Sequence, residues 1–211
     1  MKKLIFAMSA VAVLSLLAPS AGFVQQGIAN EVGLYMNPDG TGGSGTFVVG
    51  SLVDVYLVLI NPTDVENGNT PYTTINSFGC TLTFTPVPNM DLFHTGEVFP
   101  PTGVNAGDSN DINQGYLEYI VGMPTPMPVT DGSVLLAALT FLNTQTTSTI
   151  VSLGPSSSET IVGQMFYQSE LGQPRAMYSV GGSHSAAVFI FNGQAVEVED
   201  ESFGSVKALF R

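Results

Sequence analysis

The stretch from Ile75 to Thr85 (INSFGCTLTFT) constrains the fold of this chain more than any other. Its larger apolar residues recur at every second position, as Phe78, Cys80, Leu82 and Phe84, and glycine or threonine stands between them. Because successive side chains of a β-strand point to opposite faces, this alternation predicts a strand with one face in a core. Two prolines follow closely, and we expect the strand to end there because proline cannot donate a ladder hydrogen bond.

Further strand patterns recur along the chain between turns rich in Gly, Pro, Asn and Asp. No long amphipathic helix interrupts them. The sequence therefore predicts an all-β fold, an antiparallel β-sandwich of jelly-roll-like type. The other expected strands are Glu31–Met36, Leu52–Ile60, Tyr116–Met123, Thr149–Leu153 and Ala186–Phe191, with Ile161–Tyr167 and Arg175–Val180 as strands or loops.

Three segments between these strands need separate interpretation. Ser133–Leu142 is apolar on both sides. Its leucines and alanines also suit a helix, but the preceding Asp-Gly turn favours a strand, which we expect to be buried on both faces. Pro124, Pro126 and Pro128 predict a linker, since prolines are excluded from central strands. Residues 97–113 are expected to form a long loop.

The first 22 residues have the pattern of a cleaved secretory signal peptide. Lys2 and Lys3 precede an apolar run over Leu4–Leu17, and small residues follow it. The run is shorter than the ~20 residues that a membrane span needs. We therefore expect a secreted protein of the extracellular space or cell envelope, with no membrane span after signal cleavage.

A β-sandwich domain over residues 23–198 and a tail over residues 199–211 are the expected organisation of the exported chain. The acidic run Glu197–Glu201 marks the boundary. The tail reads either as a frayed terminus or as a docking or export segment. Its apolar residues Phe203, Val206, Ala208 and Leu209 would share one face of a short helix.

The charge distribution argues against nucleic-acid partners. The chain has 5 Lys and Arg against 17 Asp and Glu, a net charge of −12 at pH 7. Without Lys2 and Lys3, the remaining cations are Arg175, Lys207 and Arg211. Nucleic-acid binding needs cations that replace the counterions of phosphate, so we expect none. Anionic membrane surfaces are disfavoured for the same reason.

The single cysteine, Cys80, leaves no partner for a disulfide within the chain. It lies on the apolar face of the Ile75–Thr85 pattern. We expect it to be buried as a small hydrophobic residue, with a reactive thiol or an intermolecular disulfide as the alternative.

Two loops carry oxygen-bearing side chains that form candidate calcium sites. Calcium binds carboxylate, amide and carbonyl oxygens. Neither loop has EF-hand spacing, and Asx residues also form turns through their own backbone; turn formation is therefore the alternative. No cofactor is required by the sequence. The candidates are Asp108, Asn110, Asp111 and Asn113 on one loop, and Asp64, Glu66, Asn67 and Asn69 on the other.

Catalytic patterns are weak. His94 and His184 are the two histidines, and the chain contains neither a G-x-S-x-G elbow nor an H-E-x-x-H motif. The adjacent Ser183, His184 and Ser185 do not make a triad, since a triad depends on geometry from the fold. We therefore expect no enzyme, and a minor secreted hydrolase remains the alternative.

Sugar binding usually involves aromatic platforms. The chain has no tryptophan, and tyrosines also pack at strand edges. The candidate sugar-stacking residues are Tyr72, Tyr116, Tyr119, Tyr167 and Tyr178.

Three segments together resemble the cohesin-like family of bacterial β-sandwiches. Gly50–Asn61 is similar to the family's opening G-x-x-V-x-V-x-L-x-N strand, and Ile75–Pro86 with Met90–Leu92 to its I-x-x-F-x-x-x-L-x-Y-D-P-x-x-L strand and turn. Asp131–Phe141 is similar to its D-G-x-L-x-x-L-x-F strand. The family's Tyr-Asp-Pro is Phe-Thr-Pro here. The resemblance covers about residues 47–155 and implies a jelly-roll-like fold with a binding or scaffolding role outside the cytoplasm.

These patterns predict a secreted, non-enzymatic β-sandwich module for protein binding, scaffolding or cell-surface structure. A carbohydrate-binding module is the first alternative and a minor secreted hydrolase the second. The expected partner is an extracellular protein or a polysaccharide, and calcium is a candidate ligand.

Overall fold

The computed structural model describes residues 29–100, 103–107, 112–158 and 160–193. The expected signal peptide (1–22), the expected tail (199–211) and the calcium candidates Asp108, Asn110 and Asp111 lie outside the described residues. Within these ranges, no helix is long and apolar enough to cross a membrane.

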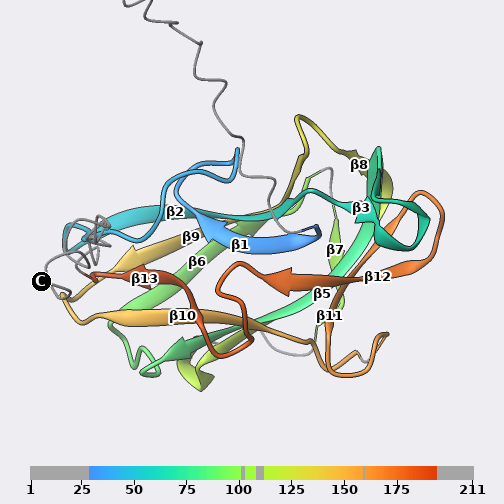
Figure 1. The fold of residues 1–211 in the computed structure, drawn as a ribbon. Helices are drawn as coiled ribbons and strands as arrows, with labels where there is room; N and C mark the ends of the chain where they lie inside the picture. Colours follow the sequence, from blue (N-terminus) through green and yellow to red (C-terminus); the bar gives the residue numbers. More distant parts are fainter. Residues whose placement is uncertain (1–28, 101–102, 108–111, 159, 194–211) are drawn as a thin grey trace, which may run out of the picture.

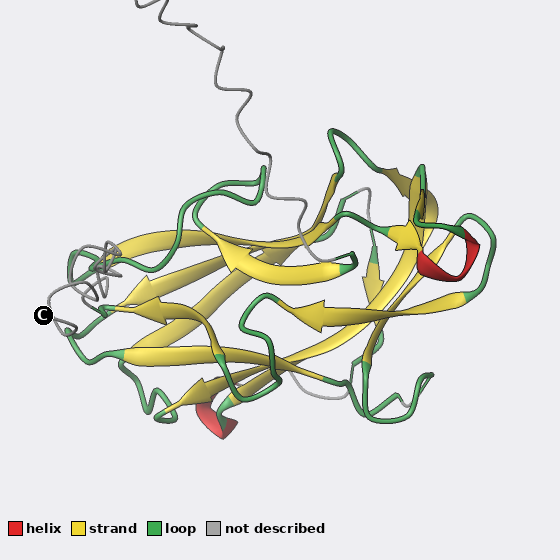
Figure 2. Cartoon of the chain, viewed as in Figure 1, coloured by secondary structure: helices red, strands yellow, loops and turns green. Residues whose placement is uncertain are grey.

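Strands dominate the described chain, and the two helices in it are single 3-10 turns (Figure 2). The elements are β1 (Glu31–Tyr35), β2 (Ser51–Ile60), β3 (Thr63–Asp64), η1 (Val65–Asn67), β4 (Thr70–Pro71), β5 (Thr74–Thr85), β6 (Leu92–Val98), β7 (Val104–Asn105), η2 (Ile112–Gln114), β8 (Tyr116–Pro128), β9 (Ser133–Asn143), β10 (Thr149–Gly154), β11 (Met165–Ser169), β12 (Pro174–Ser179) and β13 (Ala187–Phe191).

Apart from β3 and β4, which pair with each other in a separate two-stranded sheet, the strands form two layers, which we call sheet A and sheet B (Figure 1). Sheet A has the order β6-β9-β2-β1. In sheet B, β5 pairs with β8 along one edge and with β10 and β11 in succession along the other. β13, β12 and β7 extend these pairs outward. β1 pairs with β12 in parallel, which joins the layers into one curled sheet. The predicted antiparallel β-sandwich is confirmed, with this parallel pair as an addition.

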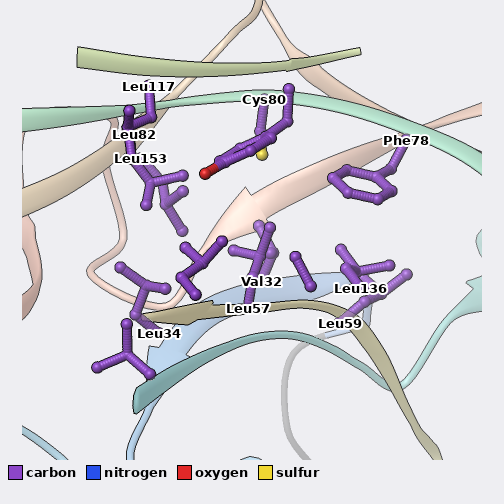
Figure 3. Packing of buried hydrophobic residues seen from close by; sticks show 14 of the residues in the cluster. Val32, Leu34, Leu57, Leu59, Phe78, Cys80, Leu82, Leu117, Leu136 and Leu153 are labelled. Atoms are coloured by element: carbon purple, nitrogen blue, oxygen red, sulfur yellow. The ribbon is translucent and has the colours of Figure 1, made fainter. Parts of the chain in front are cut away.

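The core lies between the two sheets, where their inward side chains meet. Phe78, Cys80, Leu82 and Phe84 of β5 are each at most 2% exposed, as the alternation predicts. Figure 3 shows Leu57 and Leu59 of β2 with Leu136 of β9 across from Phe78, Cys80 and Leu82. Burying such side chains is the dominant stabilising contribution to a fold of this kind.

The predicted proline linker is wrong, because β8 continues through all three prolines. The β5–β8 register runs to Gly122 and resumes at Met127 and Pro128, with a shift between Ile75 and Ser77 of β5. Pro124 and Pro126 therefore lie in the irregular part of the pairing, where no ladder N–H is needed. The proline rule excludes regular central pairing only, and it permits proline where pairing is interrupted, as it is here.

The predicted long loop over residues 97–113 contains regular structure. β6 extends to Val98, β7 covers Val104–Asn105, and η2 begins at Ile112. β6 lacks a clear alternation because its register with β9 shifts between His94 and Gly96. A bulge of this kind breaks the period of two on which strand prediction depends.

Candidate functional site

The outward face of sheet A carries apolar rows that cross three strands. Leu142 of β9 lies between Leu52 of β2 and Phe93 of β6 in the registers of both pairs. A second row places Ala138 of β9 between Tyr56 and Val98. We call these six residues the apolar strip.

The apolar strip is open to solvent at its edges. Leu52 is 64% exposed and Val98 65%. Next to the strip, Val48, Val49 and Met90 are also exposed. They lie at the same end of β9, because Asn143 Nδ2 donates to the carbonyl of Val48 and the Thr144 hydroxyl donates to that of Met90.

A single row of small polar residues separates the two apolar rows. It consists of Asp54, Thr140 and Gly96 in register. The Thr140 hydroxyl donates to Asp54 Oδ1 at 2.7 Å, which fixes the carboxylate on the sheet surface. The three rows therefore present one negative charge within an apolar surface.

Part of the outward face of sheet A, around Val58 of β2, is covered. Val58 also points outward on β2, yet it is 0% exposed. The turn around Gly40 packs on it: a Cβ at Gly40 would lie 3.5 Å from Val58 Cγ1 and 3.3 Å from Ile60 Cδ1. The outward face of sheet B is more polar than the apolar strip. On β5, for example, it carries the exposed threonines Thr83 and Thr85.

The expectation that β9 is buried on both faces is wrong. Leu136, Leu139 and Phe141 are buried, while Ala138 and Leu142 on the other face are only half-buried. Nothing within the described ranges packs a second layer on them. Apolar residues on both faces of β9 are the sequence signal for the strip, although the same pattern also predicts a strand buried in a core.

A second group of polar side chains is buried between β6 of sheet A and β8 of sheet B. His94 Nε2 lies 3.8 Å from Glu97 Oε2, and the hydroxyl of Tyr119 lies beside Glu97. Among the described residues, none forms a hydrogen bond with these three atoms. The His94 ring packs on Phe141, with ring centroids 5.4 Å apart.

Burial sets the protonation preferences in this His94–Glu97–Tyr119 cluster. It lowers the pKa of His94 below its ordinary value, partly offset by a backbone hydrogen bond at Gly96. It raises the pKa of Glu97, and the Tyr119 hydroxyl reduces that rise. Burial also raises the pKa of Tyr119 well above its ordinary value. Uncharged forms are therefore favoured at all three positions.

The calcium candidates around Asp64 lie in an ion-pair network. Arg175 Nη2 lies 3.1 Å from Asp64 Oδ2, and its Nη1 lies 3.0 Å from Glu66 Oε2. Asn67 Nδ2 donates to Asp64 Oδ2 at 2.7 Å, and this bond and Arg175 lower the pKa of Asp64. Asn69 has a positive φ of 58° in the turn that follows. A calcium ion here would compete with the guanidinium.

The other calcium group is described at one position, Asn113 in η2. Within the described residues, no group of three or more His, Cys, Asp or Glu is arranged to hold a metal ion. Calcium binding at either group stays a prediction.

The remaining candidates divide by burial. Tyr72, Tyr119 and Tyr167 are at most 4% exposed and belong to the core, so they cannot stack on a sugar. Tyr116 is half-buried and Tyr178 is 48% exposed. His184 is exposed in the turn before β13.

Comparison with known proteins gives a likeness of fold. No protein-family model matches the chain, and no curated protein matches it. Similar solved structures include the sixth cohesin of Acetivibrio cellulolyticus scaffoldin B, solved in complex with a Cel5 dockerin mutant. It is 14% identical over 79% of this chain and 100% of that chain, with a TM-score of 0.49.

Two other similar structures are cohesins as well. A type II cohesin domain from the cellulosome of Acetivibrio cellulolyticus is 14% identical over 78% of this chain and 96% of that chain, with a TM-score of 0.47. A non-cellulosomal cohesin from Archaeoglobus fulgidus is 11% identical over 71% and 86%, with a TM-score of 0.44. These structures are of the family that the strand patterns resemble, and the likeness concerns the fold alone.

Proposed function

We propose that this chain is a secreted, non-enzymatic module that binds another protein through the apolar strip. The observation that carries the proposal is the exposure of Leu52 and Val98 on a sheet face that the protein itself covers around Val58. Contiguous apolar surface that a soluble protein leaves uncovered is typical of interaction sites.

The composition of the strip suits a protein interface. Tyr, Phe and Met are enriched at such interfaces. The strip contains Tyr56 and Phe93, and Met90 lies next to it. Burying one leucine side chain such as Leu52 contributes about 1.5–3 kcal/mol. A partner that covers both rows would gain several such contributions.

Charge indicates the chemistry of the partner. The described chain contains one Lys or Arg, Arg175, and it is paired with Asp64 and Glu66. Asp54 stands in the middle of the strip. A partner that presents apolar side chains together with a Lys or Arg therefore gains the most binding free energy at this surface.

Secretion is part of the proposal and rests on the pattern of residues 1–22. The choice of a binding role over hydrolysis is supported by His184, which lies in an exposed turn, and by His94, whose ring packs on Phe141. Neither histidine is hydrogen-bonded to a serine or cysteine among the described residues.

A matched pair of variants tests the proposal. The chain from residue 23 would capture partners from the secreted and envelope fraction of its source cells, and the captured protein would be identified and titrated. Leu52 and Leu171 are 64% and 63% exposed. We expect Leu52→Lys to weaken binding roughly tenfold or more and Leu171→Lys, on the β11–β12 turn, to leave it unchanged. Equal binding by both variants, or recovery of polysaccharide alone, would contradict the proposal.

A further inference from the structure

We infer that residues 202–211 (SFGSVKALFR) bind the apolar strip of their own chain. This inference rests on the proposed function, because it names an occupant for the same surface. It follows from three independent features: the place where the described chain ends, the distance it has to cover, and the complementary charge.

The described chain ends beside the strip. Asn192 Nδ2 donates to Asn143 Oδ1 at 2.8 Å, and Asn192 Oδ1 accepts from the backbone N–H of Phe47 at 3.1 Å. The Thr46 hydroxyl donates to the carbonyl of Gly193. Asn143 lies in register with Ser51 and Leu92, so the exit is at the Leu52 and Phe93 end of the strip.

Residues 194–201, which connect the described chain to the segment, are long enough to let it reach across the strip. Residues 194–201 span up to ~27 Å when extended. The strip is about 10 Å wide from β2 to β6, as neighbouring strands lie ~4.8 Å apart. A linker this short also gives an effective concentration in the millimolar range. A segment in the same chain therefore has an advantage over the same segment of a second copy.

The charge and apolar content of the segment match the strip. Lys207 and Arg211 are two of the three cations that follow residue 22. The third, Arg175, is held by Asp64 and Glu66. The segment contains aromatic and aliphatic residues that suit the apolar rows, namely Phe203, Val206, Leu209 and Phe210. It also contains Lys207 and Arg211, either of which can form an ion pair with Asp54, whose carboxylate is held by Thr140.

Binding of this segment to the strip inhibits the binding of an external partner. An external partner must displace residues 202–211 before it binds, so its apparent affinity is reduced by the fraction of strips that are occupied. The module then exposes the strip only when a stronger apolar and cationic partner is present.

Tryptophan fluorescence tests the inference, because the chain has no tryptophan. Phe203→Trp introduces a single reporter into the chain from residue 23. We expect blue-shifted emission and protection from a soluble quencher. Adding Leu52→Lys should restore emission and quenching to those of a free peptide of residues 202–211 with the same substitution. Adding Leu171→Lys should change neither. Val98→Lys gives a second strip variant in case Leu52→Lys lowers stability.

Three results would overturn the inference. The first is a reporter as accessible as in the free peptide, and the second is protection that survives both strip variants. The third is protection that disappears on dilution, which would assign the contact to a second copy. If the reporter is free and Leu52→Lys still abolishes capture of an external partner, the inference fails while the proposed function stands.

Discussion

Burial decides the chemistry of Cys80. The residue is fully buried on the inner face of β5, and burial together with the charge of Glu118 raises the pKa of its thiol to about 12. The thiolate is the reactive form, so the folded protein holds little of it at neutral pH. The expected role as a small hydrophobic core residue agrees with this position.

A thiol-reactive probe should therefore not label Cys80 in the native protein at neutral pH. We expect labelling to rise with urea in parallel with the unfolding transition seen by circular dichroism. The denatured protein at the same pH serves as the control for reagent activity. Fast labelling without denaturant would show that the strand opens locally or that the thiol is accessible.

The His94–Glu97–Tyr119 cluster links stability to pH with two opposite signs. The folded pKa of His94 is lowered, so its contribution is present above about 6.5 and is lost as the pH falls through the folded pKa. The folded pKa of Glu97 is raised, so its contribution is present below about 4.5 and is lost as the pH rises. The thiol of Cys80 also faces this cluster, since it contributes to the raised pKa of Tyr119, and the ring of Phe141 packs on His94.

Urea unfolding from pH 4 to 8 measures how the free energy of unfolding depends on pH, and it therefore tests the opposite contributions of His94 and Glu97. We expect His94→Phe to flatten the loss of stability below about pH 6.5. We expect Glu97→Gln to gain stability relative to the parent as the pH rises above about 4.5. Parallel pH profiles for the parent and both variants would mean that the cluster is hydrated and titrates normally.

At the scale of elements, β5 shows how much a local pattern predicts. The period of two places Phe78, Cys80, Leu82 and Phe84 in the core and the intervening threonines outside. It does not explain Gly79, which is on the outer face and yet buried. The ring of Phe166 from β11 lies over it, and this neighbour comes from a strand distant in the sequence.

Gly79→Ala tests that contact. A Cβ at this position would lie 2.2 Å from Phe166 Cε1, so the ring or the strand must move. We expect the free energy of unfolding to fall by roughly 1–3 kcal/mol. Phe166→Ala in the same chain should remove much of that loss, and a double-mutant cycle in urea measures the coupling. Strictly additive losses would contradict a direct contact.

β9 marks the limit of the same reasoning. Its sequence predicts a strand, and the strand is present over Ser133–Asn143. Whether its second apolar face is covered depends on what else packs there. The turn at Gly40 covers Val58 but does not reach Leu142. Periodicity within one strand cannot show this, so the candidate site was missed.

At the scale of the whole molecule, the fold class was predictable and the strand order was not. Alternation and turn residues define strands one at a time. The parallel pairing of β1 with β12 and the succession of β10 and β11 along one edge of β5 depend on contacts between distant segments. The site depends on that order, since the strip exists only because β2, β9 and β6 are neighbours.

The calcium prediction also concerns the whole molecule, because a bound ion stabilises the folded state. Calcium at ~100 times its dissociation constant would add about 2.7 kcal/mol. We expect a melting temperature higher by several degrees in calcium than in chelator. Equal melting temperatures would contradict binding. If a shift occurs, Asp64→Asn, which also disturbs Arg175, and Asp108→Asn would show which group carries it.

Side-chain footprinting of the complex with the captured partner tests the binding claim most directly. Hydroxyl radicals would modify the exposed Leu52 and Met90, which are 64% and 68% exposed, and Val162 and Leu171, which are 78% and 63% exposed, would serve as internal references. Because we infer that residues 202–211 cover the strip in the partner-free chain, the reference is a partner-free chain that ends at residue 201. The account predicts protection of Leu52 and Met90 relative to that reference, with Val162 and Leu171 unchanged. Protection confined to sheet B, with Leu52 and Met90 modified as in that reference, would contradict it.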